Sequence, residues 1–393
     1  MRVLITVVGH RTEHWTDYFE ILATQPGVEL TLLLADVSPQ TELVLRGSSD
    51  GRPGLDCHVV PHLVGEARTG HMASIMFRPG ALRHLPLQRP DVVHIIGEAG
   101  YLSTRQVLRW SRRRWPGVPV SLYAAQNIVI RFPPPFHWLE RRAYESVTHA
   151  VPITPAALAV LRTKGFTGVA TIVPLGVDTR RFTPAPKPSP DDARFTVGFV
   201  GRLEPHKGIQ DVLAATEQRD TDLLVVGRGS LTPLVAAAAA RRPGRVRLID
   251  WVDHEQLPGL LRQMSVLALP SAEIVQRNVV PWVGIPLREQ FGRVLVEAMA
   301  CGVPVVGSDV GEIGHVIGGA GMTFPAGDVP ALSTAIATLR GDPALARRLG
   351  ETGVARAQSE FSWNHAAMTM CEIWRDLATA PAGGNRERKV MTP

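Results

Sequence analysis

The sequence predicts an α/β protein made of two doubly wound domains, and three observations support this prediction. The chain has 393 residues, more than twice the most common size of a single domain. Short apolar runs alternate with helix-like segments through both halves, as in a parallel sheet covered by helices. Between the two series, residues 184–193 (PAPKPSPDDA) contain too much proline for a helix or a central strand. A composition of 45% hydrophobic and 20% charged residues excludes disorder for most of the length.

The first half is predicted to form one parallel sheet, in a domain that covers residues 1–183. Met1–Val8 is almost entirely apolar, as expected for a strand buried on both faces. Helices are predicted at Ser103–Arg114 and Pro135–Ser146. The later apolar runs are Val28–Leu34, Asp91–Ile96, Val118–Tyr123 and Ala170–Val173. Ligands of such a sheet bind beyond the carboxyl ends of its strands, so the loops after the strands are candidate binding sites.

The second half repeats this pattern after the linker, and we expect its domain to cover residues 194–361. A terminal helix is predicted at residues 362–378 because Trp363–Leu377 has helical periodicity. Residues 379–393 are rich in small and charged residues, which predicts a disordered tail. The apolar runs of this half are Phe195–Val200, Asp222–Val226, Val246–Asp250, Val266–Pro270 and Val303–Ser308.

The net charge of +6 allows an anionic partner but does not select among nucleic acid, a phosphorylated small molecule and an acidic membrane. No apolar run approaches the roughly 18–20 residues that span a bilayer, and the first residues carry no cleavable signal pattern. We therefore expect a cytoplasmic protein. Nearly all cations are arginines, so a lysine is a rare choice in this chain. The four lysines are Lys164, Lys187, Lys207 and Lys389.

Two glutamates in residues 288–309 (REQFGRVLVEAMACGVPVVGSD) form the strongest local signal. Glu289 is predicted to precede a helix at residues 291–300, and Glu297 lies inside it. On one helix the two carboxylates would be about 12 Å apart, which exceeds the separation used by glycoside hydrolases. The spacing therefore favours two separate hydrogen-bonding roles along an extended ligand. A solvated amphipathic helix is the alternative explanation.

A second signal lies in GFVGRLEPHKGIQDVLAA, residues 198–215. A strand is predicted to end at Gly201 and a helix to begin near Gly208. Arg202 and Lys207 would project from the intervening loop, where a phosphate-bearing ligand is expected. Lys207 is a rare lysine beside a glycine, which favours a role as a compact point charge for the ligand. Chance and a solvated loop are the alternative explanations.

In the first domain, His94 and Glu98 lie at or just after the predicted end of a strand, where a ligand could bind. A hydrogen-bonded core histidine is the alternative for His94. Basic runs at residues 109–114 (RWSRRR) and 141–142 could rest on an acidic membrane, or could be solvated helix faces. The triplet Asp220-Thr221-Asp222 resembles a metal-binding DxD motif, but it is predicted at the start of a strand, away from the binding edge.

Taken together, these motifs resemble those of the retaining glycosyltransferases of family 4, which have the GT-B fold. The resemblance implies two Rossmann-like domains facing across a cleft and covers most of residues 170–330. FSW at residues 361–363 resembles the start of the last helix of that family, which returns toward the first domain. The matching segments are VPLGVDTRRF (173–182), GRLEPHKG (201–208), VVGRGS (225–230) and the Glu289/Glu297 motif continuing into EAMACGVPVV.

The resemblance implies a role for each matching residue. Arg202 and Lys207 would neutralise the diphosphate of a nucleotide sugar, Glu289 would contact the donor sugar, and these three form the catalytic set. Glu297 would hold the ribose hydroxyls, and the backbone around the start of the helix would contact sugar or phosphate. The donor-binding set is Gly201, Val252, Phe291, Gly292, Arg293, Val294 and Glu297.

The implied reaction transfers a hexosyl group, with retention, from a UDP- or GDP-sugar to a hydroxyl on a glycan, a lipid-linked or a small acceptor. The front-face route of the family needs no metal, no cofactor and no enzymic nucleophile, and nucleic acid is not an expected partner. Where many relatives carry a histidine that contacts the donor sugar, this chain has Gln126 and Asn127. These amides, with His94 and Glu98, are the candidates for sugar or acceptor contact. The oligomeric state stays open.

Other functions are less well supported by the residues. A nucleotide-sugar epimerase would need an acid/base histidine pair that we cannot identify, and a glycan phosphorylase would need a pyridoxal-binding lysine and a longer chain. An NAD-dependent oxidoreductase is disfavoured because VVGRGS supplies only GxG, with Thr232 where the third glycine should fall. A non-catalytic nucleotide- or polyanion-binding module would explain the charge but not the two glutamates.

Overall fold

A computed structural model describes residues 1–8, 15–35, 37, 41–45, 54–64, 75–132, 134–185, 194–217, 221–250, 252–276 and 284–380. The chain divides into two compact units. Unit 1 comprises Met1–Pro174, Arg277–Ile285 and Trp363–Pro393, and unit 2 comprises Leu175–Gln276 and Pro286–Ser362. The first division falls at Pro174, earlier than the predicted residue 183. Leu175–Thr183 belongs to unit 2, where Val177 N donates to Phe361 O and Arg262 donates to the Thr183 carbonyl. Of the predicted linker, only residues 184 and 185 lie within the described part.

Unit 1 contains a seven-stranded parallel sheet with the order β3-β2-β1-β6-β7-β8-β9. The strands are β1 (Arg2–Val8), β2 (Glu29–Ala35), β3 (Leu55–Val59), β6 (Val92–Ile96), β7 (Val120–Ala124), β8 (His149–Pro152) and β9 (Val169–Ala170). The direction of winding reverses between β1 and β6, and doubly wound sheets bind ligands at the carboxyl end of such a switch point. A separate antiparallel pair consists of β4 (His62–Val64) and β5 (Met76–Phe77).

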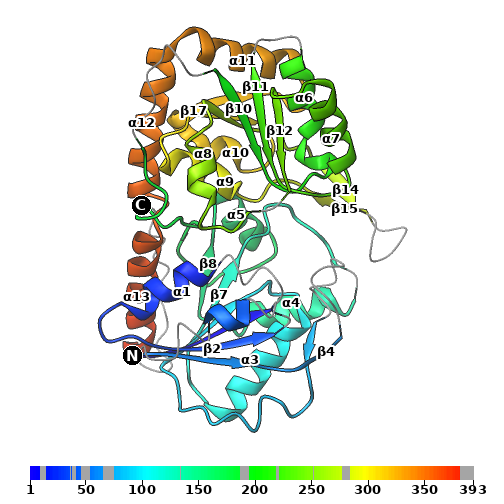
Figure 1. The fold of residues 1–393 in the computed structure, drawn as a ribbon. Helices are drawn as coiled ribbons and strands as arrows, with labels where there is room; N and C mark the ends of the chain where they lie inside the picture. Colours follow the sequence, from blue (N-terminus) through cyan, green and yellow to red (C-terminus); the bar gives the residue numbers. More distant parts are fainter. Residues whose placement is uncertain are drawn as a thin grey trace. The chain divides into compact units, whose positions relative to one another are not determined.

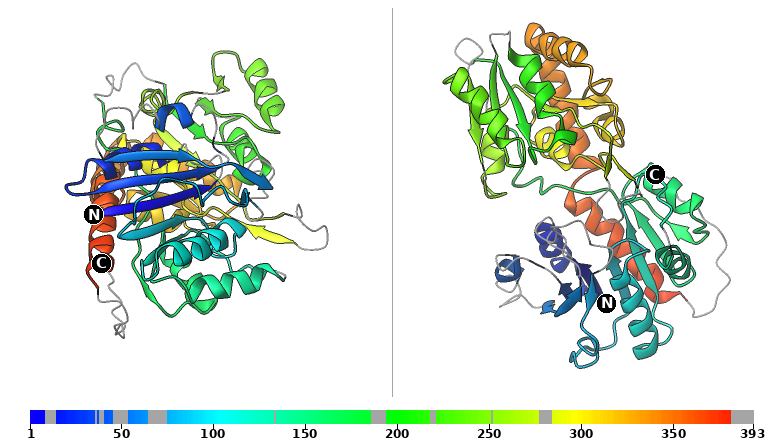
Figure 2. Two further views of the ribbon diagram at one scale, coloured as in Figure 1. Left: turned by 90° about the horizontal axis from the view of Figure 1, so that it is seen from below. Right: turned by 90° about the vertical axis from the view of Figure 1, so that its right-hand side faces the viewer.

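Helices cover both faces of this sheet. Helices α3 and α4 pack together, and α1 packs beside α13, the last helix of the chain (Figure 1; Figure 2 shows the same helices from two other sides). Trp363 of α13 lies 4.7 Å from Tyr18 of α1 between ring centroids, and Trp374 is completely buried. The predicted terminal helix is thus a part of unit 1. Its helices are α1 (Thr16–Ala23), α3 (Leu102–Arg114), α4 (Phe136–Tyr144), α5 (Pro155–Thr163) and α13 (Trp363–Thr379).

The helix α13 ends at Thr379, the first residue of the predicted tail. Residues 381–393 lie outside the described part of the chain.

Unit 2 contains a six-stranded parallel sheet with the order β12-β11-β10-β13-β16-β17. Its switch point lies between β10 and β13. The strands are β10 (Thr196–Val200), β11 (Asp222–Val226), β12 (Val246–Ile249), β13 (Val266–Leu269), β16 (Val305–Ser308) and β17 (Gly321–Phe324). Two short strands, β14 (Ile274–Gln276) and β15 (Ile285–Leu287), pair with each other. Both units therefore have the predicted doubly wound architecture.

The helices of unit 2 lie on both faces of its sheet, with α6 against α11 and α9 against α12 (Figure 1). They are α6 (Ile209–Glu217), α7 (Thr232–Arg241), α8 (Leu257–Leu261), α9 (Arg293–Ala300), α10 (Ile313–Ile317), α11 (Val329–Gly341) and α12 (Pro343–Ser359). Short 3₁₀ turns occur at η4 (Pro205–Lys207) and η5 (Gly318–Ala320).

Candidate functional site

The loops after β10 and β13 meet at the switch point of unit 2. The loop after β10 forms the turn η4 and ends at Gly208, whose φ of 72° is left-handed. A Cβ at Gly208 would collide with the carbonyl oxygen of Pro270, which follows β13. The backbone of Ala272 also donates to the carbonyl of His206 at 2.9 Å. Only glycine allows this approach, so the conformation that presents Lys207 depends on Gly208.

Lys207 makes a short ion pair with Glu289. The distance between Lys207 Nζ and Glu289 Oε2 is 2.6 Å, and Ser271 Oγ donates to the same oxygen at 3.1 Å. Both charged side chains are largely buried, with 19% of Lys207 and 13% of Glu289 exposed. Burial acts to raise the pKa of Glu289, but the ammonium of Lys207 and the two hydrogen bonds outweigh it and lower the pKa. Glu289 is therefore a carboxylate at neutral pH.

Arg293 and His254 keep Glu297 in its ionised form. Arg293 Nη2 lies 3.1 Å and His254 Nε2 lies 3.0 Å from Glu297 Oε1. Burial opposes ionisation, but Arg293 and His254 lower the pKa of Glu297 to about 2. Both contacts use Oε1, and among the described residues Oε2 accepts no hydrogen bond. This oxygen can accept hydrogen bonds from the hydroxyls of a ligand.

Close backbone packing fixes the loop that carries Arg202. A Cβ at Gly227, after β11, would collide with the carbonyl oxygen of Gly201, which explains the first glycine of VVGRGS. Glu204 accepts hydrogen bonds from the backbone and hydroxyl of Ser230. Arg202 is exposed and makes no ion pair within the described residues. Its guanidinium is thus available to an anion, whereas Lys207 already has a carboxylate partner.

The helix α9 begins at Arg293, two residues later than predicted, because Gly292 is left-handed with φ 78°. Phe291 is buried and packs edge-on against Phe361, with ring centroids 5.6 Å apart. The first-turn N–H groups of Arg293 and Val294 have no carbonyl partner within the helix and can face an anion. The side chain of Arg293 is engaged with Glu297, a contact that the sequence interpretation missed. Val252 follows β12 at the same edge of the sheet.

In unit 1, the predicted residues Glu98 and Gln126 are half-buried and lie in one polar network. Lys164 Nζ donates to Gln126 Oε1 at 2.6 Å and to Glu140 Oε1 at 2.7 Å. Glu98 Oε1 accepts from the backbone of Ala125 at 3.0 Å. Burial raises the pKa of Glu98 to about 7, although the Ala125 hydrogen bond and the charge of Lys164 oppose it. A carboxyl group with this pKa can exchange a proton near neutral pH.

The sequence interpretation placed His94 at the end of a strand, and the structure does not. His94 is in the middle of β6 and 3% exposed, and its Nδ1 lies 2.9 Å from Ser121 Oγ. Trp374 packs edge-on against its ring and donates to the same hydroxyl. Burial and the nearby His149 lower the pKa of His94 to about 3. The ring is a neutral core residue packed against α13, so the alternative explanation of His94 as a hydrogen-bonded core histidine is the one that agrees with the structure. Asn127 is also buried, after β7.

Sequence reasoning missed four residues that complete these clusters: Lys164, Glu140, His254 and Ser271. The scarcity of lysine was a usable signal for Lys164, because the two lysines in the described part both form largely buried pairs with glutamate. Ser271 directly follows a strand at the switch point, which was also a usable signal. Nothing local distinguishes His254, whose partner Glu297 is 43 residues away.

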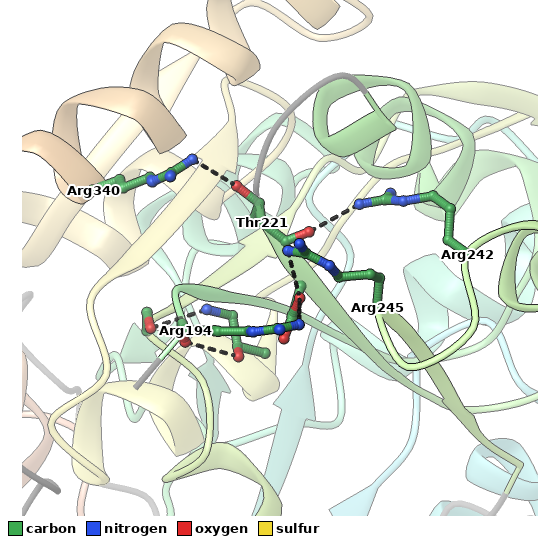
Figure 3. Close-up of polar contacts among 8 residues, drawn as sticks. Arg194, Thr221, Arg242, Arg245 and Arg340 are labelled. Carbon is green, nitrogen blue, oxygen red and sulfur yellow. Dashed lines mark hydrogen bonds and ion pairs between the residues drawn. The ribbon is translucent and has the colours of Figure 1, made fainter. Parts of the chain in front are cut away.

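Thr221 and Asp222 of the DxD-like triplet lie at the amino end of β11, away from the candidate site. Asp222 opens that strand, with Arg245 at 3.3 Å and Arg194 at 3.9 Å (Figure 3). Arg242 donates to the carbonyl of Thr221. These contacts anchor the start of the strand. Asp220 lies outside the described residues. Within the described part, no group of three or more histidine, cysteine or acidic side chains could hold a metal ion.

None of the helices in the described part of the chain has both the length and the apolar character needed to cross a bilayer.

The fold and the site define a doubly wound α/β protein with cations and carboxylates gathered at a switch point, an arrangement suited to a phosphorylated ligand. Residues 194–342 match the family model described as Glycosyl transferases group 1. These residues of the chain are therefore similar to that family, in agreement with the resemblance seen in the sequence.

Curated relatives are named as synthases, mannosyltransferases or glycosyltransferases. The glycogen synthase of Mycobacterium tuberculosis is 29% identical over 232 residues, which cover 57% of this chain and 51% of that protein. The alpha-maltose-1-phosphate synthase of Mycolicibacterium smegmatis is 31% identical over 273 residues, 61% of this chain and 66% of that one. The chain thus spans about half to two thirds of the length of these relatives.

Solved structures share the fold over nearly the whole chain. Sucrose-phosphate synthase from Thermosynechococcus elongatus matches with a TM-score of 0.68 and 21% identity, covering 96% of this chain and 99% of that one. HepE of Anabaena, solved with UDP-glucose, matches with a TM-score of 0.68 and 16% identity, covering 96% and 100%. The prediction of two Rossmann-like domains of the GT-B type is confirmed.

Proposed function

We propose that this protein is a glycosyltransferase that moves a hexosyl group from a nucleotide-diphosphate sugar to a hydroxyl acceptor. The observation that carries the proposal is the cluster at the switch point of unit 2. There the Lys207–Glu289 pair and the exposed Arg202 lie on loops, and the ionised Glu297 lies in helix α9, all within the segment that matches the glycosyl transferases group 1 model. This set supplies cations for a diphosphate and carboxylates for hydroxyl groups.

Each group has a distinct chemical role in the proposed reaction. Arg202 and Lys207 bind the diphosphate and stabilise the negative charge that develops on it as the glycosidic bond breaks. Glu297 offers its Oε2 to the ribose hydroxyls. Glu289 accepts hydrogen bonds from the donor sugar and holds Lys207 in place until the phosphates arrive. The first-turn N–H groups of α9 add hydrogen-bond donors for sugar or phosphate oxygens.

The proposed reaction proceeds with retention by the front-face route, in which the departing diphosphate helps to remove the proton of the acceptor hydroxyl. This route uses no metal, no cofactor and no enzymic nucleophile. The acceptor binds at the carboxyl edge of the unit 1 sheet, near Glu98, Gln126 and Asn127. One relative is named as GDP-mannose-dependent and one neighbour was solved with UDP-glucose, so both donor bases are candidates here.

Release of nucleoside diphosphate from a panel of UDP-, GDP- and ADP-sugars tests the proposal. We expect turnover of at least one donor, unaffected by a metal chelator, and an α-linked product from an α-linked donor. Lys207→Met and Glu289→Gln should each abolish most of this activity. A protein that binds and hydrolyses none of the donors, or variants that keep full activity, would show that the proposed function is wrong.

A further inference from the structure

A pocket of about 380 Å³ lies in unit 1, away from the groups that the proposed function uses. One wall is a face of α3, formed by residues three or four apart. The other wall is the segment that follows β5. The lining residues are Phe77, Arg78, Pro79, Gly80, Leu82, Arg83, Gln106, Arg109, Trp110, Arg113 and Arg114.

Hydrogen bonds hold the two walls together at both ends of the pocket. Gln106 of α3 accepts from Phe77 N at 2.8 Å and donates to Phe77 O at 3.1 Å. Near the other end of α3, Arg114 donates to the carbonyls of Arg83, Leu85 and Leu87. The pocket is therefore formed before any ligand binds, which reduces the entropy lost on binding.

The charge of the pocket is strongly positive and not compensated. Its eleven lining residues include five arginines and no acidic residue, against a net charge of +6 for the whole chain. Arg78, Arg83, Arg109 and Arg113 are exposed, and within the described residues none of them forms an ion pair. Arginines elsewhere, such as Arg293 and Arg356, do pair with a glutamate. A pocket with this charge attracts anions.

The pocket also has an apolar part. Phe77 and Leu82 are buried in its floor, and Trp110 packs edge-on against Trp115 with ring centroids 4.9 Å apart. A volume of this size exceeds that of an isolated phosphate and is in the range for small organic ligands. The ligand should therefore carry carbon atoms in addition to a phosphate group.

We propose that this pocket binds a phosphate ester of a small polyol. The guanidinium groups bind the phosphate oxygens in pairs, and the apolar floor contacts the carbon skeleton. Helix α3 starts shortly after Glu98, at the carboxyl edge of the sheet, and its 13 residues extend about 20 Å. The pocket lies on its last two turns, toward the opposite edge, so its ligand does not compete with the proposed acceptor. This site does not depend on the proposed function.

Binding assays with the full chain can distinguish two sources of this ligand. Co-sedimentation with vesicles of equal parts phosphatidylcholine and phosphatidylglycerol, compared with phosphatidylcholine alone, tests a lipid headgroup. Calorimetry with glycerol 3-phosphate and inorganic phosphate tests a soluble ligand. The double variant R109Q/R113Q is compared with R347Q/R348Q, which removes two exposed arginines from α12.

We expect R109Q/R113Q to weaken binding at least about tenfold, since each lost guanidinium removes a charge-assisted bond. R347Q/R348Q should bind like the wild type, and both variants should keep its unfolding temperature and its donor turnover. Binding to anionic vesicles alone assigns the ligand to a membrane, and binding of glycerol 3-phosphate shows a soluble ester. The proposal fails if neither probe binds, if both double variants lose binding equally, or if inorganic phosphate binds as well as glycerol 3-phosphate.

Discussion

At the scale of single residues, both lysines in the described part form an ion pair with a glutamate, one in each unit, and both pairs are largely buried. The attraction within such a pair offsets part of the free-energy cost of removing both charges from water. Removing one partner leaves the other charge unpaired in a largely buried place. The charge state of each of these two pairs thus depends on one lysine.

The variant Lys207→Met removes a phosphate ligand and the partner of Glu289 together. Burial then acts on Glu289 against only the Ser271 hydrogen bond and the charge of His206, so its pKa rises and the carboxylate is lost at a higher pH than in the wild type. We expect kcat/KM for the donor to fall roughly 100-fold or more, with the acid limb of its pH profile shifted upward. Lys207→Arg keeps the charge and should keep the wild-type acid limb. An unshifted limb in Lys207→Met would contradict the coupling.

The pKa of Glu297, about 2, has a consequence for stability. The pKa is lower in the folded state than in the unfolded state, so this carboxylate stabilises the fold above pH 4.5 and the contribution is lost as pH falls toward 2. We expect Glu297→Gln to lower the free energy of unfolding by up to about 3 kcal/mol at pH 7. Urea unfolding at pH 7 and pH 3 should show a smaller difference from wild type at pH 3. A difference independent of pH would contradict the assignment.

Lys164 is one of the groups that oppose the effect of burial on the pKa of Glu98 in unit 1. Its charge lowers the raised pKa of Glu98, so Lys164→Met should move that pKa further above 7. If Glu98 acts as a carboxylate toward the acceptor, the pH of half-maximal kcat/KM for the acceptor rises with it. Lys164→Arg should restore the wild-type profile. A lower activity with an unchanged pH profile would indicate a role in packing only.

At the scale of elements, the loops at the switch point depend on glycines with little room around them. Gly208→Ala forces a Cβ against Pro270 O, whereas Gly244 has a similar φ of 74° and no atom within 4 Å of an added Cβ. Both variants bear the left-handed strain of about 1–2 kcal/mol, but only Gly208→Ala displaces the turn that carries Lys207. Chemical denaturation should show the same loss of stability from strain in both variants. Donor turnover should be lost in Gly208→Ala alone. Equal activity in the two variants would contradict the role of this close approach.

The sequence predicted the elements better than the side-chain contacts. Apolar runs located the strands because buried parallel strands have a continuous apolar pattern. The predicted helix at residues 291–300 was right in kind but began too early, since a glycine can be left-handed or helical and the letters do not distinguish the two. His94 was misplaced because a histidine near a strand end looks the same whether it faces the core or the edge. Lys164 and Gln126 are 38 residues apart and meet only in the folded unit.

At the scale of the whole molecule, the two units should respond differently to a nucleotide. A nucleoside diphosphate that binds only the native state raises the apparent stability in proportion to the logarithm of its concentration. We expect UDP or GDP to raise the unfolding temperature and to protect η4 and the start of α9 from hydrogen exchange, with little change in α3. Protection of α3 instead would place the nucleotide in unit 1 and contradict the site.

The position of α13 has a consequence for synthesis of the protein on the ribosome. Trp374 is completely buried in unit 1 and donates to Ser121, 253 residues earlier in the chain. The elements of unit 2 end at Ser362, before α13 begins. A growing chain can therefore complete unit 2 while one face of the first sheet still lacks its last helix. The unit whose residues are translated first is the unit that finishes folding last.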